Sequence, residues 1–206
     1  TLPMTITWTN WSGSVRCTPQ SIQFPQTEAK IADLVHQAQR ANAHVRVAGT
    51  GHSFVPLCAS DEILISLDGL QGVIERSQGN DVVVWAGTKL HQLGDPLWAM
   101  GLALANMGDI DRQALAGAVS TGTHGTGRTL GSISTQVVGL RLVIASGEVI
   151  DCSPTQEPEI FKAAQVSLGA LGVITQITLR LLPAYQLHEH TWVTPFANCL
   201  PQLDEL

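Results

Sequence analysis

A short glycine-containing loop, Gly49-Thr50-Gly51-His52-Ser53, carries the first residues that could do chemistry. Its two glycines let backbone N–H groups approach a ligand without interference from Cβ atoms, and concave arrays of such groups bind anions. Ser53 adds a hydroxyl donor, and His52 places a nucleophilic imidazole at the tip of the loop. A sharp turn with a solvent-exposed histidine explains the same residues, so the loop by itself leaves both interpretations open.

A second stretch, residues 116–127, consists almost entirely of Gly, Ala, Ser and Thr. No Lys or Arg occurs from Gln113 to Gly127, so backbone amides and hydroxyls are the local groups that can hold a diphosphate. A flexible loop or a tightly packed turn is the alternative, but packing alone does not explain so many consecutive small residues. We interpret the stretch as part of a ligand site. For Asp109 and Asp111, which precede the stretch, three roles stay open: they orient the stretch, bind a ribose, or form a turn.

Two common nucleotide-binding motifs fit these loops poorly. The dinucleotide pattern G-x-G-x-x-G, begun at Gly49, requires a third glycine where Phe54 stands. The phosphate-loop pattern nearly fits Gly122–Thr129, but Arg128 replaces the lysine that brings a compact point charge to the β- and γ-phosphates. A phosphate-loop nucleotide-binding protein that uses Gly122–Thr129 is therefore the alternative function.

Composition argues against several other classes of protein. The chain has 206 residues, 44% hydrophobic and 14% charged, so it can bury a core and is not disordered. A net charge of −6 without a basic run argues against nucleic-acid or anionic-membrane partners. No apolar stretch approaches the ~20 residues that span a bilayer. The first residues lack the layout of a secretory signal, so we expect a cytoplasmic protein.

No metal site or disulfide framework is predicted. The four cysteines lie far apart and include no CxxC pair, which favours inert, mostly buried thiols. His188 and His190 share one face of a predicted strand, but no third ligand lies near them in the sequence.

Hydrophobic periodicity predicts the elements that position the two loops. Thr27 caps a helix whose apolar residues recur at i, i+3 and i+4 as far as Ala41. Further expected elements are short parallel strands at 45–47 and 62–67, hairpins at 73–85 and 137–152, a helix capped by Thr88, a helix at 158–165, and strands at 172–182 and 188–193. The change from parallel to antiparallel pairing predicts lobes at 1–72 and 73–186, and a truncated further domain that starts at 187–206.

The two glycine-rich stretches, in this order and at this separation, resemble the flavin-binding half of the sugar-1,4-lactone oxidases and alditol oxidases, within the vanillyl-alcohol-oxidase superfamily. The matching segments cover almost the whole chain: Trp8–Gly13, Val45–Phe54, Leu67–Leu70, Asn106–Asp109, Ala116–Gly125 and Ser167–Ile174. The resemblance implies an α+β, two-lobed FAD-binding domain of the PCMH type. A small β/α lobe would accompany a larger lobe whose antiparallel sheet is flanked by helices.

The resemblance also implies which residues bind FAD. The loop Ala48, Gly49, Thr50, Gly51, His52 and Ser53 would wrap the diphosphate, and His52 would bond covalently to the 8α-methyl group of the isoalloxazine. The remaining implied contacts are Gly108, Asp109, Gly117, Ser120, Thr121, Gly122, Thr123, His124 and, through the backbone at the adenine end, Val173 or Ile174. Because Gly108 has no side chain, it would leave room for O2 beside the flavin and favour an oxidase over a dehydrogenase.

The activity implied by the resemblance is oxidation of a sugar-derived alcohol. The donor would be an aldono-1,4-lactone, such as gulono- or arabinono-lactone, or an alditol, with O2 as acceptor and H2O2 as product. In relatives the groups that bind substrate and handle its proton come mainly from a cap domain and a C-terminal segment. We therefore name no catalytic acid or base, and we expect this chain alone to bind flavin without turnover. A flavin-storing or structural module is a third hypothesis.

Overall fold

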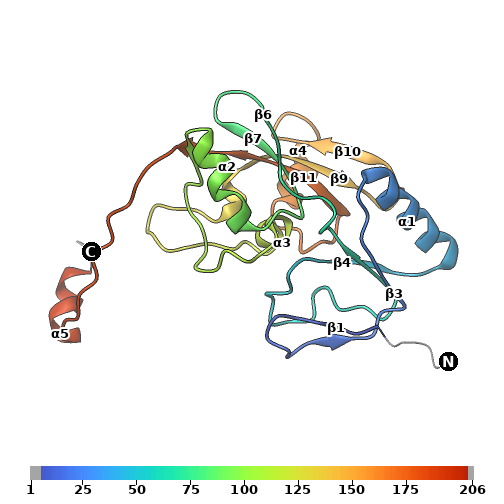
Figure 1. Cartoon of the computed structure of the whole chain (residues 1–206), viewed down its shortest axis with the longest axis horizontal. Coiled ribbons are helices and arrows are strands. Elements are labelled where there is room, and N and C mark those ends of the chain that lie inside the picture. Colours follow the sequence, from blue (N-terminus) through green and yellow to red (C-terminus); the bar gives the residue numbers. More distant parts are fainter. Residues whose placement is uncertain (1–5, 204–206) are drawn as a thin grey trace.

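The computed structural model describes residues 6–203 and contains two main sheets of different kinds (Figure 1). The smaller is parallel, in the order β3-β5-β4, with bounds Ser21–Gln23, Ile63–Ser66 and Val45–Ala48. The larger is antiparallel, in the order β10-β9-β11-β7-β6, with bounds Val149–Cys152, Val137–Val143, Val173–Arg180, Asp81–Trp85 and Val73–Arg76. The predicted change from parallel to antiparallel pairing is confirmed.

Helix α1 (Glu28–Ala41) connects β3 to β4 and begins and ends as its sequence predicts. The Thr27 hydroxyl accepts a hydrogen bond from the Lys30 N–H at 3.2 Å, which satisfies a donor that the first turn leaves open. Asn42 ends the helix in the left-handed conformation, with φ 51°. The predicted apolar stripe is buried from Ile31 to Ala38, whereas Ala41 at its end is exposed.

Strand β11 lies at the centre of the antiparallel sheet and confirms the strongest strand prediction. Its neighbours are β9 and β7, both antiparallel. The predicted inward face, from Val173 through Thr175, Ile177 and Leu179 to Leu181, is buried. On the other face Arg180 is exposed, while Ile174 is buried although the alternation places it there. Hydrophobic side chains on the inner face thus fix the register of the whole sheet.

A polar network joins α1 to this sheet. The Nε–H of Arg141, in β9, donates to both carboxylate oxygens of Glu28, at 2.9 and 3.1 Å. The hydroxyl of the fully buried Thr175 donates to the same carboxylate at 2.6 Å. Because α1 is flanked by strands of the parallel sheet, this network links the two sheets.

We expect Glu28→Gln to lower the free energy of unfolding by about 1–3 kcal/mol, because it leaves the Arg141 guanidinium with a weaker partner in a half-buried position. Urea denaturation measures the change. Asp151→Asn is the matched control, since Asp151 accepts from Arg141 Nη1 at 2.7 Å on the exposed side, and we expect it to cost about 0–1 kcal/mol. Equal costs for the two substitutions would contradict a linking role for Glu28.

Thr88 does not cap a helix, contrary to the prediction from the sequence. Its side chain is buried, where its hydroxyl donates to the Trp85 carbonyl at 2.6 Å and accepts from the Gly72 N–H at 2.9 Å. The chain continues through the 3₁₀ turn η1 (Leu90–Gln92) into α2 (Gly94–Ala99). A buried hydroxyl must find hydrogen-bond partners, and Thr88 finds them in the loops at the ends of β6 and β7.

The predicted strand at 188–193 is wrong. Strand β12 (Leu182–Pro183) pairs with β8 (Leu102–Ala103), and the chain then runs without regular structure to α5 (Phe196–Cys199) and η3 (Leu200–Gln202). Figure 1 shows this segment extending away from both sheets. Its alternating sequence does not form a strand because, among residues 6–203, no neighbouring strand takes up its backbone hydrogen bonds.

The remaining regular elements are the hairpin β1 (Trp8–Thr9) and β2 (Arg16–Cys17), α4 (Pro158–Ala164), and the elements α3 and η2 described with the site. Of the four cysteines, which are all free thiols, Cys152 alone is buried, so the expectation of mostly buried thiols is wrong. Burial raises the pKa of the Cys58 and Cys152 thiols, which opposes reactivity. Within residues 6–203 no helix is both long and apolar enough to cross a membrane; a cytoplasmic location stays a prediction.

Candidate functional site

A cleft brings the two glycine-rich stretches together. Its lining comes from segments that are far apart in the sequence, chiefly 46–53, 86–89, 113–121 and 168–174. The empty volume is about 1070 Å³, part of it open to solvent. The parallel sheet supplies one wall through β4 and the loop after it, and α3 with the start of β11 supplies the other.

Residues of the N-terminal hairpin hold the first glycine loop in place through hydrogen bonds. The Trp11 N–H donates to the Gly51 carbonyl at 2.9 Å, and Asn10 Nδ2 donates to the Ser53 carbonyl at 3.0 Å. Gly51 has φ +70°, and a Cβ there would lie 3.1 Å from the Cα of Asn10. The position therefore requires glycine.

The amides of this loop stay available to a ligand. In the part of the chain that the structure describes, the N–H groups of residues 50–53 donate no hydrogen bond to the protein. Free N–H groups along one loop form an anion-binding concavity when they converge on a cleft.

His52 lines the cleft and is half-buried, so it is not an imidazole in open solvent. Its ring stacks on Trp11, with centroids 5.4 Å apart and planes at 26°. Phe54 contacts Trp11 edge-on, with ring centroids 6.3 Å apart. The stack limits how the imidazole can turn, which is what a positioned nucleophile needs.

The second small-residue stretch is partly helical rather than a continuous loop. Helix α3 (Leu115–Ser120) starts where the Leu115 N–H donates to the Thr88 carbonyl and the Ala116 N–H donates to the Ala86 carbonyl. These bonds dock the start of α3 beside the end of β7. A Cβ on Gly117 would have no other atom within 4 Å, because Gly117 faces the cleft. Small residues here keep a helix close to the space that a ligand would fill.

Most of the predicted FAD contacts line this cleft: Ala48, Gly49, Thr50, Gly51, His52, Ser53, Gly117, Ser120, Thr121 and Ile174. The others, Gly108, Asp109, Gly122, Thr123, His124 and Val173, are not among the lining residues. The Thr123 N–H donates to the Ala118 carbonyl at 2.9 Å, and a Cβ on Gly108 would lie 2.9 Å from Thr123 Cγ2. Gly108 and Thr123 therefore pack against each other, beyond the end of α3.

The phosphate-loop alternative is not supported. A phosphate loop joins a β-strand to the start of an α-helix. Here Gly122–Thr129 follows helix α3 and leads through the 3₁₀ turn η2 (Ile133–Gln136) into strand β9. The segment thus has a helix where the motif needs a strand, and a strand where it needs a helix.

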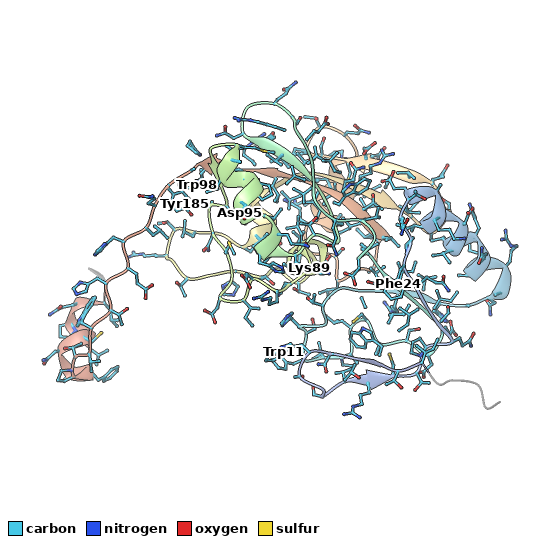
Figure 2. All side chains as sticks on the ribbon, viewed as in Figure 1. Trp11, Phe24, Lys89, Asp95, Trp98 and Tyr185 are labelled. Atoms are coloured by element: carbon cyan, nitrogen blue, oxygen red, sulfur yellow. The ribbon has the colours of Figure 1, made fainter. Side chains whose placement is uncertain are left out.

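Two cationic side chains that the sequence patterns do not single out, Arg46 and Lys89, also line the cleft. The lining contains no Asp or Glu, although the chain carries a net charge of −6. In the view of Figure 2, Lys89 lies above Trp11. The sequence around Lys89 does not predict that this residue lines the cleft, because Lys89 pairs there with Ala114, which is far away in the sequence. The charge balance of the lining favours an anionic ligand.

Asp68 holds the Lys89 ammonium, with Nζ and Oδ1 2.6 Å apart. Burial raises the pKa of Asp68, but hydrogen bonds with Lys89, Ser66 and Gln71 outweigh it and hold the pKa below its ordinary value. A carboxyl group whose pKa is lower in the folded state stabilises the fold above its unfolded pKa of about 3.9. That stabilisation disappears as the pH falls through the folded pKa.

We expect Asp68→Asn to lower the free energy of unfolding by up to about 1 kcal/mol at pH 7, because the ion pair is partly exposed to solvent, and by less near pH 3. Urea denaturation at the two pH values measures this. The exposed Asp33 in α1 provides the control through Asp33→Asn. A cost for Asp68→Asn that is the same at both pH values would refute the pKa argument.

Comparison with known proteins gives the family of the chain. Residues 19–153 match the family model described as "FAD binding domain", and the chain belongs to this family. Among its relatives is the L-gulono-1,4-lactone dehydrogenase of Mycobacterium tuberculosis, 43% identical over 199 residues, which are 96% of this chain and 46% of that protein. The D-arabinono-1,4-lactone oxidase of Eremothecium gossypii is 37% identical, over 93% of this chain and 37% of that protein.

A solved structure confirms the fold. Chitooligosaccharide oxidase superposes with a TM-score of 0.75 over 87% of this chain and 41% of its own, at 21% identity. The chain spans less than half the length of these relatives. The family resemblance and the fold class predicted from the sequence are thereby confirmed.

The cleft residues fit FAD. A diphosphate needs donors and positive charge, and the cleft offers the free amides of residues 50–53, Lys89 and Arg46. Asp68, the carboxylate that pairs with Lys89, is not among the lining residues. Gly117 leaves open space where any side chain would intrude. Within residues 6–203 no cluster of three His, Cys, Asp or Glu side chains is arranged to hold a metal ion.

Proposed function

We propose that this chain is the FAD-binding part of an oxidase that acts on a sugar-derived alcohol. The donor is an aldono-1,4-lactone such as gulono- or arabinono-lactone, or an alditol, and O2 accepts the electrons to give H2O2. The observation that carries the proposal is the single cleft into which residues 49–53 and 114–121 both open, with His52 at its edge. The lactone dehydrogenase and lactone oxidase among the relatives support the substrate class.

Bound FAD would supply the two-electron oxidation of a C–H bond next to a hydroxyl group. The chain's own part is to bind and orient it. We propose that the amides of residues 50–53 hold the diphosphate and that His52 forms a covalent bond to the 8α-methyl group. The stack on Trp11 supports this role for His52 because it limits rotation of the imidazole. Gly108, Asp109, Gly122, Thr123, His124 and Val173 stay predictions as further contacts.

We propose the domain division 1–72, 73–186 and 187–206, with the last segment starting a cap domain. The division is supported by the sheets, since every strand of the parallel sheet lies before residue 73 and every strand of the antiparallel sheet lies at 73–186. Residues 187–203 also support it, because nearly all of them are exposed and Figure 1 shows this segment extending away from both sheets. The groups that bind substrate and accept its proton belong, in this proposal, to polypeptide beyond this chain.

The test uses the complete protein that contains this chain. We expect a yellow protein with flavin absorbance, which produces peroxide when a sugar lactone or an alditol is added in air. A flavoprotein that reduces an artificial electron acceptor but gives no peroxide would replace the oxidase proposal by a dehydrogenase. Flavin without turnover of any lactone or polyol would leave the storage or structural module, and a protein that binds no flavin would refute the proposal.

A further inference from the structure

Lys89 occupies an unusual place for a lysine. Its side chain is 15% exposed, although lysine ammonium groups are normally kept in water. It lines the same cleft as the glycine loop. Burial of an ammonium is unfavourable without partners, so the surroundings of Lys89 must compensate for it.

The backbone of Lys89 is fixed from two sides. Its N–H donates to Gln92 Oε1 at 2.7 Å, and the residue forms an antiparallel bridge with Ala114 at the start of α3. The next residue, Leu90, donates its N–H to the Gln113 carbonyl at 3.0 Å. Lys89 is therefore anchored to the same wall that carries Gly117.

A chain of hydrogen bonds outside the cleft lining holds the ammonium group. Gln92 Nε2 donates to Gln71 Oε1 at 3.0 Å, Gln71 Nε2 donates to Asp68 Oδ1 at 3.3 Å, and Lys89 Nζ donates to the same oxygen at 2.6 Å. Asp68 is half-exposed and does not line the cleft. An ammonium has three N–H donors, and the residues described offer the Lys89 side chain Asp68 alone as a hydrogen-bond acceptor.

We propose that Lys89 binds a phosphate group of FAD directly and that Asp68 is the residue that positions its ammonium. This inference rests on the proposed FAD site and adds a cation to it. The free amides of residues 50–53 and the ammonium of Lys89 then hold the diphosphate together. Arg46, which is exposed, does not share the buried geometry of Lys89.

The test measures reversible binding of FAD and of riboflavin, which lacks phosphate, by quenching of flavin fluorescence. All proteins carry His52→Ala so that exchange stays reversible whether or not a covalent bond forms otherwise. We expect Lys89→Met to weaken FAD binding by about 10- to 100-fold, as for loss of a charged hydrogen bond, and to change riboflavin binding by less than about twofold. Lys89→Arg should restore most of the affinity for FAD, because it keeps the charge.

Lys30→Met is the matched control, since it removes the same charge from the exposed face of α1. It should leave both ligands unaffected. Inorganic pyrophosphate should compete with FAD in the parent protein, which carries His52→Ala alone. It should compete less in the protein that also carries Lys89→Met.

The outcomes distinguish failure of the proposed Lys89–phosphate contact from failure of the proposed FAD site. Equal weakening of FAD and riboflavin by Lys89→Met would show that Lys89 acts at the ring or on the fold, and would overturn the phosphate contact. Unchanged FAD binding in Lys89→Met, with intact binding in the parent, would also overturn it while the FAD site stands. A parent protein that binds neither flavin would overturn the proposed function together with this inference.

Discussion

Replacement of His52 by alanine is expected to release all flavin into the supernatant when the protein is precipitated with acid. The protein with His52 intact should keep its yellow colour in the pellet, because a covalent bond survives denaturation and non-covalent contacts do not. Absorbance of pellet and supernatant measures the two fractions. The expected effect is complete, since no other described residue is proposed to bond to the flavin.

His91→Ala is the control for this prediction. His91 is exposed in η1 and does not line the cleft, so its removal should leave the flavin in the pellet. Full release of flavin from the protein with His52 intact would contradict the covalent bond and leave reversible FAD binding possible. Because His52 is half-buried and contacts Trp11, a stability measurement on His52→Ala should accompany the assay.

A leucine at Gly117 is expected to weaken FAD binding by at least about 100-fold while the fold persists, since several buried ligand contacts would be lost together. The space beside Gly117 is open in the protein, and FAD would occupy it. Replacing a helical glycine also removes a destabilising residue, by up to about 1 kcal/mol. Binding and stability should therefore change in opposite directions.

Fluorescence titration with FAD and urea denaturation measure these two effects. Gly94→Leu is the matched control, because Gly94 is also helical and a Cβ there would likewise have no other atom within 4 Å, but it lies in α2 away from the cleft lining. It should leave FAD binding unchanged. If Gly117→Leu binds FAD as tightly as the parent protein, FAD does not lie against α3.

Elements with local causes could be predicted from the sequence. Thr27 and Asn42 set the ends of α1 through short-range hydrogen bonds and a left-handed turn. The alternation in β11 and the hairpin β6–β7 follow from which side chains must leave water. Prediction failed at Thr88, whose hydroxyl bonds to the Trp85 carbonyl and to the N–H of Gly72 in another part of the chain instead of capping a helix. It also failed at 188–193, where alternation occurs without a neighbouring strand.

The order and spacing of the glycine-rich segments also carried the resemblance to a family of FAD-binding proteins, which the family match confirms. Such segments are visible in a sequence because a backbone that closely approaches a ligand tolerates few side chains, so the segments are rich in small residues. Tertiary structure alone decided which of those segments share one cleft, and that the uncharged second stretch has Lys89 beside it. Contacts between distant residues depend on how the sheets pack, and no local pattern encodes that packing.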